Sequence, residues 1–289
     1  MTNHLKRRAV GAAALLAVPV LGAPALLARP ARAQASPLQF GVMPNVSPRV
    51  LLTQYQPFRA FLEQDLARPV EVVTAPGLAP FHERTVAGAY GLVVTAANLG
   101  RVAQKDAGLQ PFAIYEPRIP GLLVTHRDRP VTDIGAIRGR QVAMTNPQSL
   151  VALKFVHWAR AAGIRIGQDA SAVHARNEDS LAQLLTGPDT PLAVMSRGEF
   201  NAIGPAVRET LVVWQQFAAV PAFLMLLGPG TPPEEARRIT TCISRFPASP
   251  AARQFFELTG FRGIRAVTDA DLAEVDDVVD ETRTLLRGA

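Results

Sequence analysis

Residues 38–48 read LQFGVMPNVSP, and the architecture of the chain can be worked out from them. The apolar run at 38–42 predicts a buried strand that ends at the turn-forming pair PN. Ser47 then stands ahead of Pro48 as a capping residue before a proline, so a helix is predicted to begin at Pro48. A strand that leads into a helix start is typical of α/β folds, and the free backbone N–H groups there attract anions.

The same alternation of strand and helix continues along the chain. Short apolar runs bounded by Gly, Pro or Asn predict strands at 38–42, 70–74, 92–95, 112–115, 122–126, 141–144, 192–195, 211–214 and 222–227. Helical periodicity is present at 48–66, 80–87, 147–162, 179–185, 232–246, 251–258 and 269–286. Helix caps are predicted at Ser47, Asn146, Ser249 and Thr268. This pattern predicts parallel sheets flanked by helices.

The basic character of the sequence is confined to its first 33 residues. The chain has 289 residues, with 30 Lys and Arg against 24 Asp and Glu, and 48% of it is hydrophobic, which excludes intrinsic disorder. Five basic and no acidic residues lie in 1–33, so the remainder carries 25 basic and 24 acidic residues. A nearly neutral chain predicts no nucleic-acid partner.

Residues 1–33 have the three parts of an export signal. Residues 6–8 are cationic, residues 9–27 are almost wholly apolar, and Ala31-Arg32-Ala33 offers small residues at the spacing that a signal peptidase reads. We predict cleavage near Ala33, a periplasmic location and no membrane anchor after cleavage. An uncleaved anchor is the alternative, disfavoured because two glycines and two prolines interrupt the apolar run. Sec and Tat export both remain open.

Cysteine use agrees with an exported, soluble protein. Cys242 is the only cysteine, so the chain forms no internal disulfide, and none lies near the cleavage point to take a lipid. Its apolar neighbours predict a buried residue rather than a reactive thiol. We predict a monomer.

The sequence contains none of the common catalytic or metal-binding motifs. It has no Gly-rich phosphate loop, dinucleotide fingerprint, nucleophile elbow or His-x-x-x-His pair. The four histidines beyond residue 33 are scattered, and Glu178-Asp179 most simply complements a helix dipole. We predict no enzymatic activity, no cofactor and no metal.

Eight segments, taken in order, resemble one protein family. They are FGVMPNVSP (40–48), YQPF (55–58), RPVEVVTA (68–75), YGLVVTA (90–96), AQKDAG (103–108), LLV (122–124), IRG (137–139) and VTDADL (267–272). The ordered set resembles the phosphate/phosphite/phosphonate-binding proteins of ABC importers and spans nearly the whole chain after the leader.

This resemblance implies a type II periplasmic binding fold, an α/β architecture of two lobes joined by two crossover strands with a ligand cleft between them. Residues 37–125 and 222–289 would form lobe one, and residues 126–221 an inserted lobe two. The crossovers would be 122–126 and about 219–226. Such lobes close on their ligand by hinge motion.

The family binds its ligand with loops at strand ends and helix starts, so the resemblance implies a site made of the matching positions here. These are Asn45, Ser47, Ala75, Thr95, Ala96, Asn98, Tyr115, Asn146, Gln148, Ser149, Asn177 and Ser196. Their hydroxyls, amides and backbone N–H groups suit a small anionic ligand. For the polar side chains, a cap or turn role is the alternative.

The sequence departs from the family pattern at two loops. Members commonly have Asp before the 92–95 strand and Pro-His or Pro-Tyr after it, whereas this chain has Gly91 and Ala97-Asn98. Family members often have a His in the loop before the helix of lobe two, and the matching residue of this chain is Asn177. Because Asn donates and accepts hydrogen bonds but never ionises, the site would bind other protonation states of a ligand.

We therefore predict a periplasmic binding protein for a small oxyanion, of the phosphonate, phosphite or phosphate class, that delivers it to an ABC permease. The alternative is a ligand-sensing receptor for a different small anion that docks on a sensor kinase or redox partner. An enzyme on the same fold is disfavoured by the export signal and by the lack of a positioned base or nucleophile.

Overall fold

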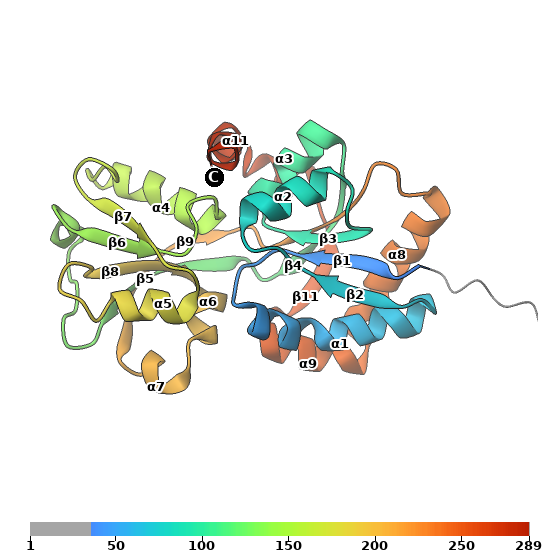
Figure 1. Cartoon of the computed structure of the whole chain (residues 1–289), viewed down its shortest axis with the longest axis horizontal. Coiled ribbons are helices and arrows are strands. Elements are labelled where there is room, and N and C mark those ends of the chain that lie inside the picture. The colour runs from blue at the N-terminus through green and yellow to red at the C-terminus, as the bar shows by residue number, and fades with distance from the viewer. Residues whose placement is uncertain (1–35, 289) are drawn as a thin grey trace, which may run out of the picture. The chain divides into compact units, whose positions relative to one another are not determined.

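Two β-sheets organise the part of the chain that the computed structural model describes, residues 36–288 (Figure 1). The predicted export signal lies outside these residues. We call each sheet, with the helices that pack on it, a lobe. Lobe one contains the six-stranded sheet and lobe two the five-stranded sheet.

The sheet of lobe one has the strand order β11-β4-β10-β3-β1-β2. Its strands are β1 (Leu38–Val42), β2 (Val70–Val73), β3 (Leu92–Thr95), β4 (Gln110–Glu116), β10 (Leu224–Leu227) and β11 (Gly263–Ala266). β1 pairs in parallel with β2 and β3, but β10 runs antiparallel between β3 and β4. The prediction of parallel sheets is therefore wrong here, because β10 enters this sheet on the return from lobe two.

The sheet of lobe two is mixed in the same way, with the order β7-β6-β8-β5-β9. Its strands are β5 (Ile119–His126), β6 (Gln141–Met144), β7 (Ser171–His174), β8 (Leu192–Ser196) and β9 (Leu211–Val220). β6 is parallel to β7 and β8, whereas β5 is antiparallel to both β8 and β9. β5 and β9 are the strands that carry the chain into and out of this lobe.

Helices cover both faces of each sheet (Figure 1). Those of lobe one are α1 (Pro48–Leu66), α2 (Leu78–Val86), α3 (Ala97–Ala107), α8 (Pro233–Arg245), α9 (Pro250–Thr259), α10 (Asp269–Ala273) and α11 (Val279–Arg287). Those of lobe two are α4 (Leu150–Ala161), α5 (Glu178–Leu184), α6 (Arg197–Ala202) and α7 (Pro205–Arg208). Short 3-10 turns are η1 (Ile134–Ile137), η2 (Phe246–Ala248) and η3 (Asp276–Val278).

The chain passes between the two sheets at residues 117–118 and 221–223. β5 pairs with lobe-two strands along its length, including the residues 122–125 that the sequence assigned to lobe one. We propose that lobe one comprises residues 37–117 and 222–288, and lobe two residues 118–221. Two short connections of this kind suit a hinge.

Of the four predicted helix caps, Ser249 and Thr268 are confirmed, Ser47 is confirmed in its position at the start of α1 but not in its side-chain bond, and Asn146 is wrong. Ser249 and Thr268 accept hydrogen bonds from backbone N–H groups of α9 and α10. Asn146 caps no helix, because its Oδ1 accepts from the Gln148 N–H in a tight turn and α4 starts later, capped by Ser149. The Ser47 hydroxyl makes no bond to its own helix α1.

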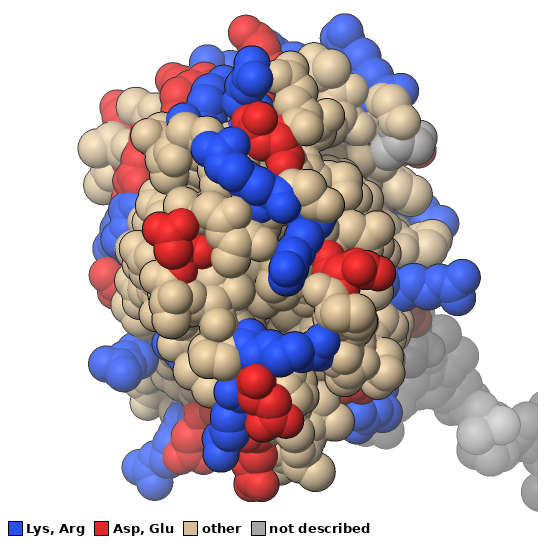
Figure 2. Space-filling view, turned by 90° about the vertical axis from the view of Figure 1, so that its left-hand side faces the viewer, with Lys and Arg blue, Asp and Glu red and all other residues tan. Residues whose placement is uncertain are grey.

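The core of lobe one is aromatic. Phe58 stacks on Phe246 with ring centroids 4.1 Å apart, and Phe40 and Phe255 pack edge-on around them. Cys242 is buried, as predicted, and its burial raises the pKa of the thiol. On the molecular face turned to the viewer in Figure 2, Lys and Arg side chains are interspersed with Asp and Glu.

Candidate ligand cleft

Strand ends and helix starts of both lobes line one small cavity of about 50 Å³. Lobe one contributes the loop after β1, with Asn45, and the loop after β3, with Ala96. Lobe two contributes Thr145, Asn146 and Ser149 after β6, and Ser196 with Glu199 after β8. One water molecule needs about 10–15 Å³ on this scale, so the cavity suits a ligand of few heavy atoms.

The amino end of α4 faces this cavity through its cap. Ser149 Oγ accepts from the Ala152 N–H at 3.1 Å, and Ser149, Leu150 and Val151 all line the cavity wall. The first N–H groups of a helix have no partner within the helix, and its dipole favours negative charge at this end. The helix start of lobe two thus opens onto the cavity.

Among residues 36–288, Glu199 is the only acidic or basic residue on the wall of the small cavity. Its carboxyl accepts from the Thr145 hydroxyl at 2.5 Å and from the Ser196 N–H at 2.7 Å. Burial raises the pKa of the Glu199 carboxyl, and this effect outweighs the hydrogen bonds that lower it. A carboxyl group that keeps its proton can donate a hydrogen bond to a ligand oxygen.

At the helix start of lobe one, the position where an anion was expected holds a carboxylate of the protein. The Ser47 N–H donates to Glu178 Oε2 at 3.0 Å, and the Ser47 hydroxyl donates to Glu178 Oε1 at 2.7 Å. Glu178 begins α5 of lobe two and is only 2% exposed. This buried contact links the two lobes.

A second, larger cavity of about 390 Å³ adjoins the first, with which it shares Asn45, Ile119, Ser196 and Phe223. Its wall combines aromatic rings, among them Tyr55, Phe223 and Phe261, with three arginines. The arginines are Arg118, Arg197 and Arg262, and no acidic residue of the described part of the chain, 36–288, lines this cavity. Its wall is therefore more basic than that of the small cavity.

Two further contacts between the lobes involve predicted site residues. The buried Asn98 side chain of α3 donates to the Gln148 carbonyl at 3.0 Å and to Thr282 Oγ1 at 3.1 Å. Gln148 Nε2 donates to the Leu285 carbonyl at 3.0 Å. Both side chains therefore join lobe two to α3 and α11 and do not line either cavity.

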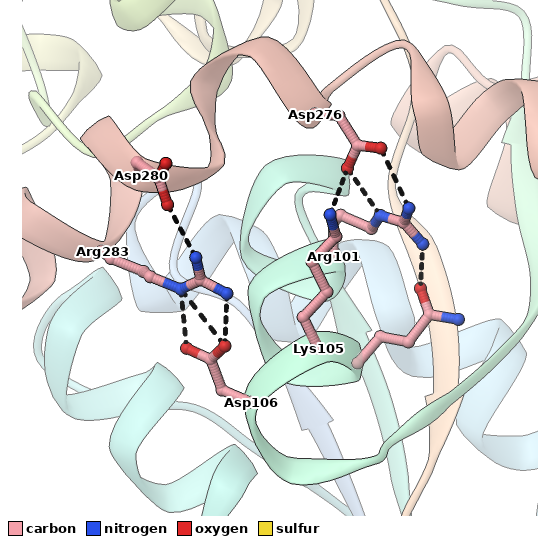
Figure 3. Close-up of polar contacts among 7 residues, drawn as sticks. Arg101, Lys105, Asp106, Asp276, Asp280 and Arg283 are labelled. Carbon is pink, nitrogen blue, oxygen red and sulfur yellow. Dashed lines mark hydrogen bonds and ion pairs between the residues drawn. The ribbon is translucent and has the colours of Figure 1, made fainter.

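The C-terminal segment, residues 276–287, is anchored to α3 by exposed or half-exposed ion pairs (Figure 3). Asp276 Oδ1 lies 2.8 Å from Arg101 Nε and 3.0 Å from Lys105 Nζ. Arg283 pairs with Asp106 at 2.5 Å. These pairs lie within lobe one and orient the segment.

The same segment reaches lobe two through α4. Lys154 Nζ lies 2.8 Å from Asp277, and His157 Nε2 lies 2.8 Å from Glu281. The four side chains are between 22% and 54% exposed. The C-terminal segment thus forms a second, more solvated link between the lobes.

The twelve predicted site residues fall into three groups. Asn45, Ala96, Asn146, Ser149 and Ser196 line the small cavity. Ser47, Asn98, Gln148 and Asn177 are engaged elsewhere, the first three between the lobes and Asn177 as the cap of α5, where its Oδ1 accepts from the Ser180 N–H. Ala75, Thr95 and Tyr115 are buried and line neither cavity.

The prediction that Tyr115 lines the cleft is wrong in this structure. Its ring stacks on Phe261 with centroids 4.4 Å apart, and the side chain is 1% exposed in the core of lobe one. The sequence reasoning missed Glu199, although Ser196 and Glu199 have the spacing of a capping box, which the structure contains. The sequence indicated for Glu178 only an interaction with the dipole of its own helix, because no local sequence pattern connects Glu178 with Ser47.

Residues 36–288 contain no cluster of three or more His, Cys, Asp or Glu that could hold a metal ion. Within the same residues, no helix has the length and apolarity needed to cross a membrane.

Solved structures with this architecture include several binding proteins. A binding protein component of an ABC phosphonate transporter from Pseudomonas aeruginosa has a TM-score of 0.75 at 12% identity, over 86% of this chain and 87% of that one. PhnD1 from Prochlorococcus marinus, in complex with methylphosphonate, has 0.73 at 10% identity, over 85% and 98%. A Xanthomonas citri protein bound to ATP has 0.68 at 17% identity, over 86% and 99%. At these identities the likeness shows the fold alone, the type II periplasmic binding fold.

The sequence comparisons assign the chain to a family. A search of curated proteins finds no match. Residues 40–272 match the family described as "ABC transporter, phosphonate, periplasmic substrate-binding protein", which covers well over half of the chain. This family consists of substrate-binding transport proteins of the periplasm and not of enzymes. The chain belongs to the family of periplasmic substrate-binding proteins of ABC phosphonate transporters.

Proposed function

We propose that this protein binds a small oxyanion of the phosphonate, phosphite or phosphate class in the small cavity and delivers it to an ABC permease. The observation that carries the proposal is the convergence of polar groups from both lobes on that cavity. A ligand held by both lobes stabilises their closed arrangement, because it binds that arrangement more tightly than the open one.

The donors in the small cavity suit an oxyanion. Asn45 approaches from lobe one, while Asn146, Ser149 and the amino end of α4 approach from lobe two. Hydrogen bonds from such groups to a charged oxygen are stronger than those between neutral partners. Burial raises the pKa of Glu199 and so favours the neutral carboxyl, which can donate to a ligand oxygen and carries no second negative charge beside it.

A thermal-shift panel tests the proposal. The protein purified from the periplasm is melted with phosphate, phosphite, methylphosphonate, sulfate, arsenate and small carboxylates. A phosphorus oxyanion should raise the melting temperature in a concentration-dependent way, since ligand bound only to the folded state adds RT ln(1 + [L]/Kd) to stability. A shift with carboxylates and none with phosphorus oxyanions would refute the phosphorus class.

Two serine caps provide a matched pair of variants for the site. Ser149 caps α4 at the cavity, and Ser249 caps α9 away from it. Ser149→Ala and Ser249→Ala should each cost about 1 kcal/mol of stability through the lost cap. Only Ser149→Ala should weaken methylphosphonate binding, by about tenfold for a lost hydrogen bond to a charged group, as measured by calorimetry. Equal affinity in both variants would remove Ser149 from the site.

The larger cavity favours a second candidate, a receptor for a bulkier organic anion. Arg118 is already paired with Glu274, but Arg197, Arg262 and the aromatic rings of the wall suit a planar or aromatic anion. The similar Xanthomonas citri protein was solved with ATP, which is such an anion. Arg197 and Arg262, on opposite lobes, would then hold the charged group.

Phenylphosphonate and ATP distinguish this candidate from the first. If the larger cavity is used, both compounds should bind more tightly than methylphosphonate, and Arg197→Gln should weaken them at least tenfold. Arg253→Gln, an exposed arginine of α9, is the control and should leave their affinity unchanged. Binding of methylphosphonate alone, unaffected by Arg197→Gln, would exclude the larger cavity as the ligand site.

A further inference from the structure

The small cavity and the larger cavity have one wall in common. Asn45, Ile119, Ser196 and Phe223 line both of them. Two of these side chains are polar and can contact an oxyanion, whereas Ile119 and Phe223 are apolar and suit carbon atoms. A ligand in the small cavity therefore has a second space, of about 390 Å³, directly beside it.

The volume of the small cavity limits how much of a ligand it can hold. At about 10–15 Å³ for each water-sized atom, its volume of about 50 Å³ has room for about three to five heavy atoms. The phosphorus and the oxygens of a phosphonate group fill this space. A longer substituent on the phosphorus must then extend beyond the small cavity, and the shared wall leads towards a space that is large enough for it.

Two arginines of the larger cavity have no acidic partner. Arg197, the first residue of α6 in lobe two, and Arg262, just before β11 in lobe one, form no ion pair within residues 36–288. The Arg197 guanidinium lies over the Phe200 ring, 5.7 Å from its centroid, and this contact orients the group. The third arginine, Arg118, is paired with Glu274. The uncompensated positive charge thus comes from one arginine of each lobe.

This charge decides which substituents the larger cavity favours. A guanidinium group binds a carboxylate or a phosphate through charge-assisted hydrogen bonds, which are stronger than those between neutral partners. An ammonium group at the same place would be repelled by both arginines. An uncharged alkyl chain would gain only the apolar contacts of the wall.

From this arrangement we infer that the ligand is a phosphonate with a negatively charged substituent, whose phosphonate group lies in the small cavity and whose substituent reaches Arg197 and Arg262 in the larger one. The inference rests on the proposed oxyanion function, and it gives the two cavities to one ligand. The two arginines then determine specificity among phosphonates. Because they belong to different lobes, their contacts with the substituent also favour the closed arrangement.

Three phosphonates of similar length test the charge of the substituent. 3-Phosphonopropionate ends in a carboxylate, propylphosphonate in a methyl group and 3-aminopropylphosphonate in an ammonium group. Calorimetry with the protein purified from the periplasm should give about tenfold tighter binding of 3-phosphonopropionate than of propylphosphonate, as expected for an added hydrogen bond to a charged group. 3-Aminopropylphosphonate should bind most weakly.

The outcomes separate this inference from the proposed function. Equal affinities for the three compounds, or tightest binding of 3-aminopropylphosphonate, would overturn the inference and leave the oxyanion function in place. If none of the phosphonates binds, the proposed function fails and the inference fails with it.

Variants in both cavities test whether one ligand occupies them together. Arg197→Gln and Arg262→Gln should each weaken 3-phosphonopropionate about tenfold. Both should leave propylphosphonate binding nearly unchanged, which also verifies that they are folded. Ser149→Ala, in the small cavity, should weaken both compounds to the same degree. Arg253→Gln, an exposed arginine of α9, is the control and should bind both like the wild type.

One result with these variants would contradict the shared site directly. If 3-phosphonopropionate is weakened by Arg197→Gln but not by Ser149→Ala, the compound lies wholly in the larger cavity, and the inference is overturned. If it is weakened by Ser149→Ala but by neither arginine variant, the substituent does not reach the arginines, and the inference is overturned as well.

Discussion

The two lobes are joined by contacts of opposite kinds at two places. Beside the cleft, Glu178 accepts hydrogen bonds from Ser47, and Asn98 donates to Gln148, and these side chains are buried or partly buried. At the C-terminal segment, the links are ion pairs such as Lys154 with Asp277, with side chains open to solvent (Figure 3 shows the anchoring pairs on α3). The two places differ in how deeply their contacts are buried, not in how many contacts they have.

Burial decides which of these links matters energetically. A hydrogen bond to a charged group that is shielded from water contributes about 1.5–3 kcal/mol, and breaking it leaves a buried group without a partner. An exposed ion pair contributes about 0–1 kcal/mol and is weakened by salt. We therefore expect the cleft contacts to control the separation of the lobes, while the C-terminal segment guides their movement.

The largest effect on stability should come from Asn98→Ala. The side chain is fully buried and makes two hydrogen bonds, one of which crosses to lobe two. Its loss should lower the free energy of unfolding by about 1–3 kcal/mol, because the Gln148 carbonyl loses its buried partner. Chemical denaturation measures this, with the exposed Asn201→Ala as a control expected to change stability by less than about 0.5 kcal/mol. Similar losses in both variants would mean that burial is not the deciding factor.

The effect of pH on the free energy of unfolding should have opposite signs at the cleft and at the C-terminal segment. The group that acts in the cleft is Glu199. Burial raises the pKa of its carboxyl in the folded state above the ordinary value of 4.5. The unfolded chain therefore releases this proton first, and stability falls as pH rises from about 4.5 through the folded-state pKa. Glu199→Gln should remove this decline in denaturation curves recorded between pH 4 and pH 8, whereas the exposed Glu209→Gln should retain it. A decline that persists in Glu199→Gln assigns it to another group.

Asp276 in the C-terminal segment should act in the other direction. Arg101 and Lys105 lower the pKa of its carboxyl below the ordinary value of 3.8. Its contribution is present above pH 3.8 and is lost as pH falls below it, because the unfolded chain takes up the proton first. Asp276→Asn should make the acid-induced loss of stability slightly smaller, as followed by melting between pH 5 and pH 2. A steeper loss in the variant would contradict the assignment.

The smallest effect is expected for the ion pair that crosses between the lobes. A double-mutant cycle of Lys154→Gln and Asp277→Asn should give a coupling of about 0–0.5 kcal/mol that disappears in 1 M NaCl. The two single variants serve as each other's controls in the cycle. A coupling above about 1 kcal/mol that persists in salt would show that the C-terminal segment links the lobes as firmly as the cleft does.

Much of the secondary structure was predictable because its signals are local. The helix at 48–66 agrees with the structure at both ends, since Pro48 marks its start and its apolar face repeats along it. The strands β7 and β11 were missed because both are short edge strands with exposed residues, which lack a continuous apolar run. The helix predicted at 269–286 is broken into α10, η3 and α11.

The site was predictable only to the level of its loops. Asn45, Asn146, Ser149 and Ser196, which the family resemblance implied as ligand groups, line the cavity, where strand ends of both sheets meet. The direction in which a side chain points depends on neighbours that are distant in the sequence. The prediction that Tyr115 lines the cleft was therefore wrong, because this residue packs in the core.

The sequence by itself determined most of the elements, because periodicity, caps and turn residues act over a few positions, and its resemblance to a family indicated the loops that form the cleft. Only the tertiary structure decided what occupies the two helix starts. Ser47 and Glu178 are 131 positions apart, and their hydrogen bonds exist only because the two lobes bring α1 and α5 together. A contact between such distant residues leaves no local pattern, and so the anion at the start of α1 could not be read from the chain.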